Sequence, residues 1–124
     1  MKKHVLIIMA HGSRKTEANN EFEQLIKVMS AQGLDYIMIK HCFLEMAEPN
    51  LPSVIEECLS LGYKQFDLYP LFFNQGNHVS RDIPEQIQAV QQQHPECSVR
   101  QLDYFGSFDQ LAHGITEHIY RQNT

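Results

Sequence analysis

Four apolar segments of strand length alternate along the chain with four segments of helical periodicity, and this alternation is what most limits the fold. The strand-like segments are residues 5–10, 36–43, 66–73 and 98–104. The first of them, Val5–Ala10, is continuously apolar, as is typical of a strand covered on both faces. Because strands that alternate with helices through short connections form right-handed crossovers, the pattern predicts a parallel sheet with helices on both faces.

In each segment between or after the strands, apolar residues recur at spacings of three and four. These helical positions are Ala18, Phe22, Leu25, Ile26 and Met29; Leu51, Val54, Ile55, Cys58 and Leu59; Ile83, Ile87 and Val90; and Phe108, Leu111, Ala112, Ile115 and Ile119. Asn50 is a typical cap for the second helix, and Ser80 or Asp82 for the third. We therefore predict a flavodoxin-like open sheet of four parallel strands, in a single α/β domain spanning residues 1–124.

The composition excludes several classes of protein. A formal net charge of −5 argues against a surface that neutralises nucleic-acid phosphates. No apolar stretch approaches the ~20 residues that a membrane-spanning helix needs, so we expect no membrane association. Cys42, Cys58 and Cys97 are an odd set without C-x-x-C spacing, which fits neither a disulfide framework nor a thiolate zinc site. The cysteines therefore predict a reducing compartment, the cytoplasm.

Two histidines follow predicted strands and lie next to glycine-containing turns. His11 follows the first strand, in Ala10-His11-Gly12-Ser13-Arg14, and His78 follows the third, in Gly76-Asn77-His78. Since the carboxyl ends of parallel strands open onto one crevice, we expect the two imidazoles to meet there. The sequence thus indicates a metal site at this edge of the sheet.

A carboxylate after the second strand completes the expected ligand set. Glu45 is the first candidate, and Glu48, three residues later, is its rival. Two imidazoles and one carboxylate suit divalent Fe, Co, Ni or Zn and leave coordination positions open for a substrate. We interpret the other histidines as ordinary hydrogen-bonded residues: His4, His41, His94, His113 and His118.

Basic residues flank both histidines. Arg14 and Lys15 follow His11, and Arg81 follows His78, each close to the start of a predicted helix. Ser13 and Ser80 precede these helices, whose amino termini favour negative charge. The arrangement predicts an anion-binding surface on an otherwise acidic protein.

Four sequence pieces, in this order, resemble the small sirohydrochlorin cobaltochelatases, the single-lobe class II chelatases of tetrapyrrole biosynthesis. The resemblance runs over residues 5–108. It is carried by the apolar strand into His11-Gly12-Ser13-Arg14, by Phe43-Leu44-Glu45 with Ala47-Glu48-Pro49, by Pro70-Leu71-Phe72-Phe73 leading to Gly76-x-His78, and by Asp82-Ile83-Pro84.

The resemblance implies a lyase that inserts a divalent metal ion into sirohydrochlorin or a related tetrapyrrole, with the metal as substrate and no organic cofactor. Cobalt is the first expectation, with nickel or iron as alternatives, and the pathway, whether that of cobalamin, sirohaem or a nickel tetrapyrrole, stays open. His11, His78 and Glu45 would be both the metal-handling and the catalytic residues. Residues that would contact the substrate are Ser13, Arg14, Lys15, Gly76, Asn77, Ser80 and Arg81. A chain with one lobe further implies a homodimer whose paired crevices enclose the macrocycle.

Two other functions remain open at this point. A metal or tetrapyrrole carrier would use the same crevice without accelerating insertion. A nucleotide-binding or phosphoryl-transfer domain would use the loop after the first strand for anions. This second alternative is disfavoured because the chain has neither a Walker loop nor G-x-G-x-x-G after that strand.

Overall fold

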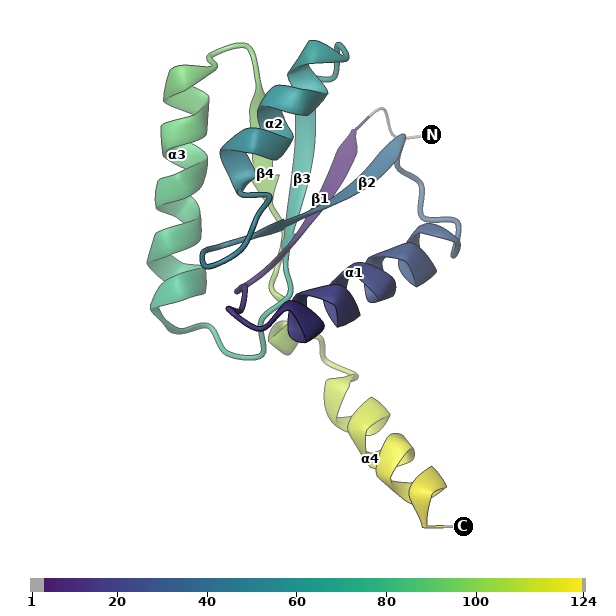
Figure 1. The fold of residues 1–124 in the computed structure, drawn as a ribbon. Helices are drawn as coiled ribbons and strands as arrows, with labels where there is room; N and C mark the ends of the chain where they lie inside the picture. The colour runs from purple at the N-terminus through teal and green to yellow at the C-terminus, as the bar shows by residue number, and fades with distance from the viewer. Residues whose placement is uncertain (1–3, 124) are drawn as a thin grey trace.

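The computed structural model describes residues 4–123, so the ends of the predicted domain, 1–3 and 124, lie outside the described residues. Strands and helices alternate along the chain as the sequence pattern predicts (Figure 1). The elements are β1 Val5–Ala10, α1 Thr16–Ser30, β2 Met38–Phe43, α2 Leu51–Ser60, β3 Gln65–Pro70, the π-helical turn η1 His78–Asp82, α3 Ile83–Gln93, β4 Ser98–Gln101, the 3-10 turn η2 Phe105–Ser107, and α4 Leu111–Gln122.

The four strands form one parallel sheet in the order β2-β1-β3-β4. β1 lies between β2 and β3, with Val5 opposite Met38 on one side and Phe66 on the other. This central position explains why β1 is apolar throughout, since both of its faces and both of its edges are covered. The predicted flavodoxin-like parallel architecture is therefore confirmed.

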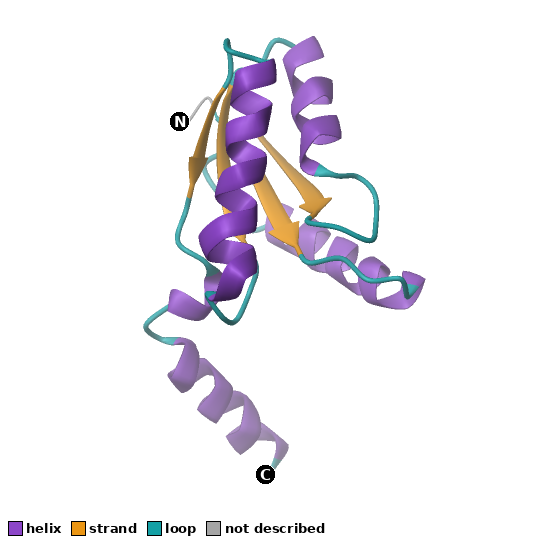
Figure 2. Ribbon diagram, turned by 90° about the vertical axis from the view of Figure 1, so that its left-hand side faces the viewer, coloured by secondary structure: helices purple, strands orange, loops and turns teal. Residues whose placement is uncertain are grey.

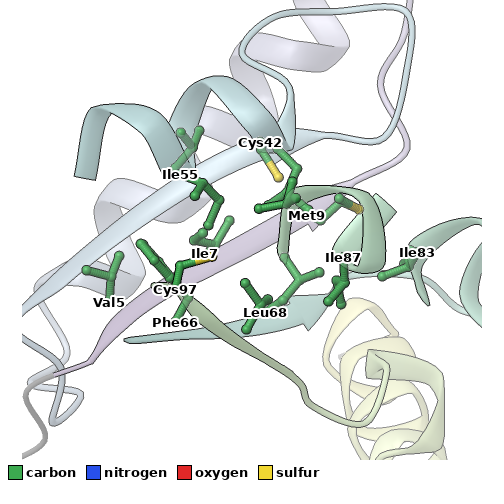
Figure 3. Packing of buried hydrophobic residues seen from close by; sticks show 14 of the residues in the cluster. Val5, Ile7, Met9, Cys42, Ile55, Phe66, Leu68, Ile83, Ile87 and Cys97 are labelled. Atoms are coloured by element: carbon green, nitrogen blue, oxygen red, sulfur yellow. The ribbon is translucent and has the colours of Figure 1, made fainter. Parts of the chain in front are cut away.

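Alternate residues of β1 define the two layers of the core. Val5, Ile7 and Met9 pack with α2 and α3 on one face, in the cluster of Figure 3. Leu6 and Ile8 pack against α1 on the other face. Because side chains alternate across a strand, each face of the sheet receives its own helices, as the views of Figures 1 and 2 show.

α4 differs from the other helices because it projects away from the sheet instead of covering a face (Figures 1 and 2). Among the described residues, none in α4 is buried, and Ile115 and Ile119 are 47% and 54% exposed. The sequence pattern correctly predicts a helix here, but its apolar side has no packing partner within the described chain. None of the helices that the structure describes is long and apolar enough to cross a bilayer.

Two capping predictions have different outcomes. Asn50 caps α2 as expected, because its side-chain oxygen accepts a hydrogen bond from the Ser53 amide at 3.0 Å. The prediction for α3 is wrong: Ser80 lies inside η1, and Asp82 precedes α3 without a capping hydrogen bond. The carboxylate of Asp82 instead binds a histidine, as described below.

The buried cysteine in β2 predicts a loss of stability at alkaline pH. Burial raises the pKa of the Cys42 thiol from 9.0 to about 12. Above pH 9 the unfolded chain therefore releases a proton that the folded chain retains, so stability is complete below pH 9 and falls as the pH rises. The slope approaches about 1.4 kcal/mol per pH unit only once the unfolded thiol is mostly ionised, so we expect a loss of about 2 kcal/mol between pH 9 and pH 11. Urea unfolding of wild type and Cys42→Ala at both pH values measures it, and equal losses in the two proteins would refute this cause.

Candidate metal-handling site

The loops that leave β1, β2 and β3 at the carboxyl edge of the sheet bring His11, Glu45 and His78 together. The imidazole rings of His11 and His78 lie edge to face, with their centroids 4.7 Å apart. Nε2 of His11 lies 3.3 Å from a carboxylate oxygen of Glu45. Residues 67 positions apart in the sequence thus share one surface at this edge, as the carboxyl-end rule for parallel sheets predicts.

His11 is oriented by its own loop. Its Nδ1 lies 3.0 Å from the carbonyl oxygen of Gly12, which can only accept, so we assign the ring proton to Nδ1. Nε2 then presents its lone pair toward Glu45. The Nε2 lone pair and the Glu45 carboxylate oxygen, 3.3 Å apart, are both hydrogen-bond acceptors, so a proton or a metal cation between them would stabilise the pair.

His78 is oriented by a carboxylate. Its Nδ1 lies 2.9 Å from Asp82, and because the ionised carboxylate only accepts, Nδ1 carries the proton and Nε2 is free as a ligand. A carboxylate behind a histidine in this way fixes both the tautomer and the direction of a metal-binding nitrogen. The two residues are the first and last of the π-helical turn η1, a conformation that is frequent at functional sites.

The sequence indicates Asp82 as a candidate helix cap and as part of the Asp82-Ile83-Pro84 motif, but it does not predict the contact of Asp82 with His78. The spacing of four residues is the signal that could have found it, since side chains at i and i+4 are neighbours on a helix.

The loops of His11 and Glu45 are fixed to each other through their backbones. The Glu45 amide donates to the carbonyl of His11 at 3.0 Å, and the Leu44 amide donates to Ala10 at 2.8 Å. Gly12 passes this loop with a φ of +100°, and a Cβ placed there would lie 1.8 Å from the Glu45 carbonyl oxygen. Only glycine allows this approach, so Gly12 helps to set the separation of His11 from Glu45.

Phe72 forms an apolar wall beside both imidazoles. Its ring centroid lies 6.4 Å from that of His11 and 6.3 Å from that of His78. The ring is partly buried against the main core. The side chain next to the histidine pair therefore has no metal-ligating atom and no charge.

Glu48, the rival carboxylate, lies in a different environment from Glu45. Its Oε2 accepts a hydrogen bond from the Asn50 amide at 3.2 Å, at the start of α2. The structure places Glu45, and not Glu48, beside His11.

The predicted substrate-contacting residues divide into two groups by position. Ser13, Arg14 and Lys15 precede α1; the Ser13 hydroxyl accepts from the Lys15 amide at 3.0 Å, and both basic side chains are exposed. The remaining four residues belong to the loop before α3 and to η1, namely Gly76, Asn77, Ser80 and Arg81. The Ser80 hydroxyl donates to the Gly76 carbonyl at 2.7 Å, so it stabilises the turn around His78. Arg81 is 64% exposed, with Nε 3.5 Å from Asp82.

Within residues 4–123, no group of three or more His, Cys, Asp and Glu side chains is arranged to hold a metal ion. His11, His78 and Glu45 are therefore neighbours without forming a closed three-ligand cage.

Each of the five remaining histidines has a local polar neighbour, as their interpretation as ordinary residues expects: Asp67 for His4, Glu23 for His41, Glu56 and Glu96 for His94, Glu117 for His113, and Gln122 for His118.

The parallel sheet and the oriented histidine pair at its carboxyl edge define an α/β protein with a metal-handling surface. The family model described as CbiX matches residues 5–122, and the chain belongs to this family. The resemblance seen in the sequence motifs is thereby confirmed.

Two relatives have names that state their activity. A sirohydrochlorin ferrochelatase of Priestia megaterium is 29% identical over 118 residues, which is 95% of this chain and 44% of the relative. A sirohydrochlorin cobaltochelatase of Methanococcus maripaludis is 30% identical over 80 residues, covering 64% of this chain and 55% of the relative. The chain thus spans about half the length of these curated relatives.

Two solved structures share the fold. A chain described as a cobalamin (vitamin B12) biosynthesis CbiX protein from Marinobacter aquaeolei VT8 is 26% identical, with a TM-score of 0.83 and 96% coverage of both chains. The sirohydrochlorin chelatase SirB from Bacillus subtilis subspecies spizizenii, in complex with cobalt, is 22% identical with a TM-score of 0.86. The match covers 97% of this chain and 51% of SirB, and at this identity it supports the fold alone.

Proposed function

We propose that the protein inserts a divalent metal ion into sirohydrochlorin or a closely related tetrapyrrole. Cobalt is the first candidate metal, with nickel and iron as alternatives, and both iron and cobalt insertion occur among the names of its relatives. The observation that carries the proposal is the pair of imidazoles 4.7 Å apart, each with its Nδ1 held by an acceptor. The unprotonated Nε2 atoms, of which that of His11 lies beside Glu45, are left to handle a transition metal.

The chemistry of insertion explains why these side chains suit the reaction. The incoming ion loses ligands while two pyrrole N–H protons leave the macrocycle, so the site must hold the ion weakly and accept protons. Imidazole does both near neutral pH, and a carboxylate such as Glu45 beside His11 can take a proton as the metal departs. A closed cage would retain the ion, whereas two imidazoles leave coordination positions for pyrrole nitrogens.

The surface around the pair suits an acidic, flat substrate. Arg14, Lys15 and Arg81 are exposed next to the histidine loops and can form charge-assisted bonds with carboxylates of the macrocycle. The amino terminus of α1, directly behind Ser13, adds partial positive charge. Phe72 offers an apolar edge for the ring system.

A time course of the macrocycle's absorbance with Co²⁺, with and without the protein, tests the proposal against a carrier function. A chelatase increases the rate of the spectral change in proportion to protein concentration. With a carrier, the rate of insertion at given concentrations of free metal and free macrocycle would be the same with and without the protein. That result would show a binding protein and not an enzyme.

We expect the loss of the Asp82 carboxylate to weaken metal binding. In Asp82→Ala, Nδ1 of His78 loses its acceptor and the ring loses its fixed tautomer, so Co²⁺ affinity measured by titration calorimetry should fall about 10–100-fold. Asp82→Asn keeps an acceptor oxygen and should recover part of the affinity. Glu85→Ala removes an exposed carboxylate from the first turn of α3 and serves as the control. Equal affinities for Asp82→Ala and this control would exclude Asp82 as a positioning residue.

The proposal also includes a homodimer in the cytoplasm, acting on a tetrapyrrole. Its support is the apolar side of α4, where Ile115 and Ile119 are 47% and 54% exposed and no residue of α4 is buried within the described chain. The three cysteines are free and buried, which is compatible with a reducing compartment.

A further inference from the structure

The candidate metal-handling site is built from two parts of the chain that must be held at a fixed separation. The first part is the pair of loops after β1 and β2, which carry His11 and Glu45 and are joined by backbone hydrogen bonds. The second part is η1, which carries His78 and continues directly into α3, since the Ile83 amide donates to the His78 carbonyl. The separation of the imidazoles therefore depends on how α3 and η1 are held against the loop after β2.

The side chain of Gln86 connects these two parts. Gln86 lies in α3 four residues after Asp82, which lies four residues after His78, so the three positions follow one another along one side of the helix. Its Nε2 donates a hydrogen bond to the Leu44 carbonyl oxygen at 3.2 Å. Because a carbonyl oxygen only accepts, this contact also assigns the two ends of the amide group. Figure 1 shows the loop after β2 beside the beginning of α3.

Leu44 is the residue through which a displacement of α3 would reach the other part of the site. Its amide donates to the Ala10 carbonyl at 2.8 Å, and the amide of the next residue, Glu45, donates to the His11 carbonyl at 3.0 Å. Leu44 is 6% exposed and belongs to the same core cluster as Ile83. A continuous path of hydrogen bonds and peptide bonds thus runs from α3 through Leu44 and Glu45 to the loop of His11.

The other end of the Gln86 amide shows that this residue is a poor choice for stability alone. Its Oε1 is buried, and no donor within residues 4–123 forms a hydrogen bond with it. A buried acceptor without a partner lowers stability, which offsets what the Nε2 hydrogen bond contributes. Departures of this kind from the usual rules of packing are expected at functional sites.

Gln91, five residues further along α3, has the contact of a structural glutamine. Its Oε1 accepts a hydrogen bond from the Val99 amide at 2.8 Å and so joins α3 to β4. This contact satisfies a backbone donor of a buried residue and does not involve the loops of the site. Two glutamines of one helix therefore differ in what they hold together.

We propose that Gln86 is a positioning residue, which holds η1 against the loop after β2 and thereby sets the separation of His78 from His11 and Glu45. The inference rests on the proposed function, because it assigns a role in the same metal-handling site. Gln86 acts through Leu44 and not by contact with the metal. Groups that bind one ion must be held within about 0.5 Å of their working geometry, so the loss of this contact should weaken metal binding without unfolding the chain.

Co²⁺ affinity and stability, measured on three methionine variants of α3, test the proposal. Methionine is unbranched like glutamine and has no N–H donor. In Gln86→Met, the Co²⁺ affinity from titration calorimetry should fall about 10-fold, as for other groups that orient metal ligands, while the urea midpoint stays close to that of wild type. Gln91→Met should show the reverse, a lower midpoint with unchanged affinity, because the Val99 amide loses its acceptor. Gln88→Met changes an exposed glutamine of the same helix and should alter neither quantity.

A second background separates positioning from a general loosening of the fold. In His78→Ala the histidine pair no longer exists, so adding Gln86→Met should leave the remaining Co²⁺ affinity unchanged. Equal affinities of wild type and Gln86→Met would overturn the proposal, and so would a loss of affinity that persists in the His78→Ala background. A fall in the urea midpoint as large as that of Gln91→Met would show an ordinary structural contact instead.

These measurements do not involve metal insertion, so the two proposals fail separately. Unchanged Co²⁺ affinity in Gln86→Met removes the positioning role and leaves the proposed chelatase activity standing. A protein that does not accelerate insertion, but whose Co²⁺ affinity falls in this variant, loses the chelatase activity and keeps the positioning role.

Discussion

Replacing His11 or His78 by alanine should lower the rate of metal insertion into sirohydrochlorin about 100-fold or more. Each variant loses one of the two nitrogens that hold the ion and accept protons, and general acid–base groups contribute about 10²–10⁴-fold. The side chains are 37% and 45% exposed, so their removal leaves no buried cavity and the fold should persist. Initial rates from the absorbance of the metallated macrocycle, with circular dichroism as the check on folding, measure the effect.

The control for these variants is His94→Ala. His94 follows α3 at the end far from η1, and its imidazole contacts Glu56 at 3.4 Å. This variant should insert metal at the wild-type rate. If His11→Ala and His78→Ala both retain near-normal turnover, the histidine pair is not the metal-handling site.

Replacing Gly12 by alanine should destabilise the protein by about 3–5 kcal/mol, among the largest effects of a single methyl group. The new Cβ would lie 1.8 Å from the Glu45 carbonyl oxygen, at a φ of +100° that side chains rarely adopt. The loops of His11 and Glu45 must then separate, so insertion activity should fall together with stability. Urea unfolding at neutral pH gives the free energy.

Gly62→Ala is the matched control because Gly62 has a φ of +93° but nothing within 4 Å of its added Cβ. It isolates the cost of the left-handed backbone conformation, about 1–2 kcal/mol, from the steric conflict. Similar losses in the two variants would show that the contact between the loops of His11 and Glu45 is not tightly packed.

The periodicity of apolar residues predicts most of the architecture. β1 spans 5–10 in both prediction and structure because a fully buried strand has a sharp boundary in hydrophobicity. β3 and β4 end earlier than predicted, at Pro70 and Gln101, because the apolar residues that follow them pack as loops and not as strands. The placement of α4 could not be predicted, since periodicity identifies an apolar face but not the surface that it packs against.

The candidate site follows from topology more than from any motif. The carboxyl ends of β1 and β3 share one edge of the sheet, so the proximity of His11 and His78 could be predicted from their positions after these strands. The contact of His78 with Asp82 has the i, i+4 spacing of a helix, but the predicted third helix begins only after Ser80 or Asp82, so the pattern does not place the two residues on one turn. The choice between Glu45 and Glu48 depends on backbone hydrogen bonds that spacing alone does not specify.

The coordination of Co²⁺ bound to the protein tests the central claim most directly. A crystal soaked with a cobalt salt should show one ion with Nε2 of His11 and Nε2 of His78 both at about 2.0–2.2 Å, and with open or solvent-filled positions beside them. Cobalt bound through a single imidazole, through Nδ1 of either ring, or at a different surface of the chain would contradict it.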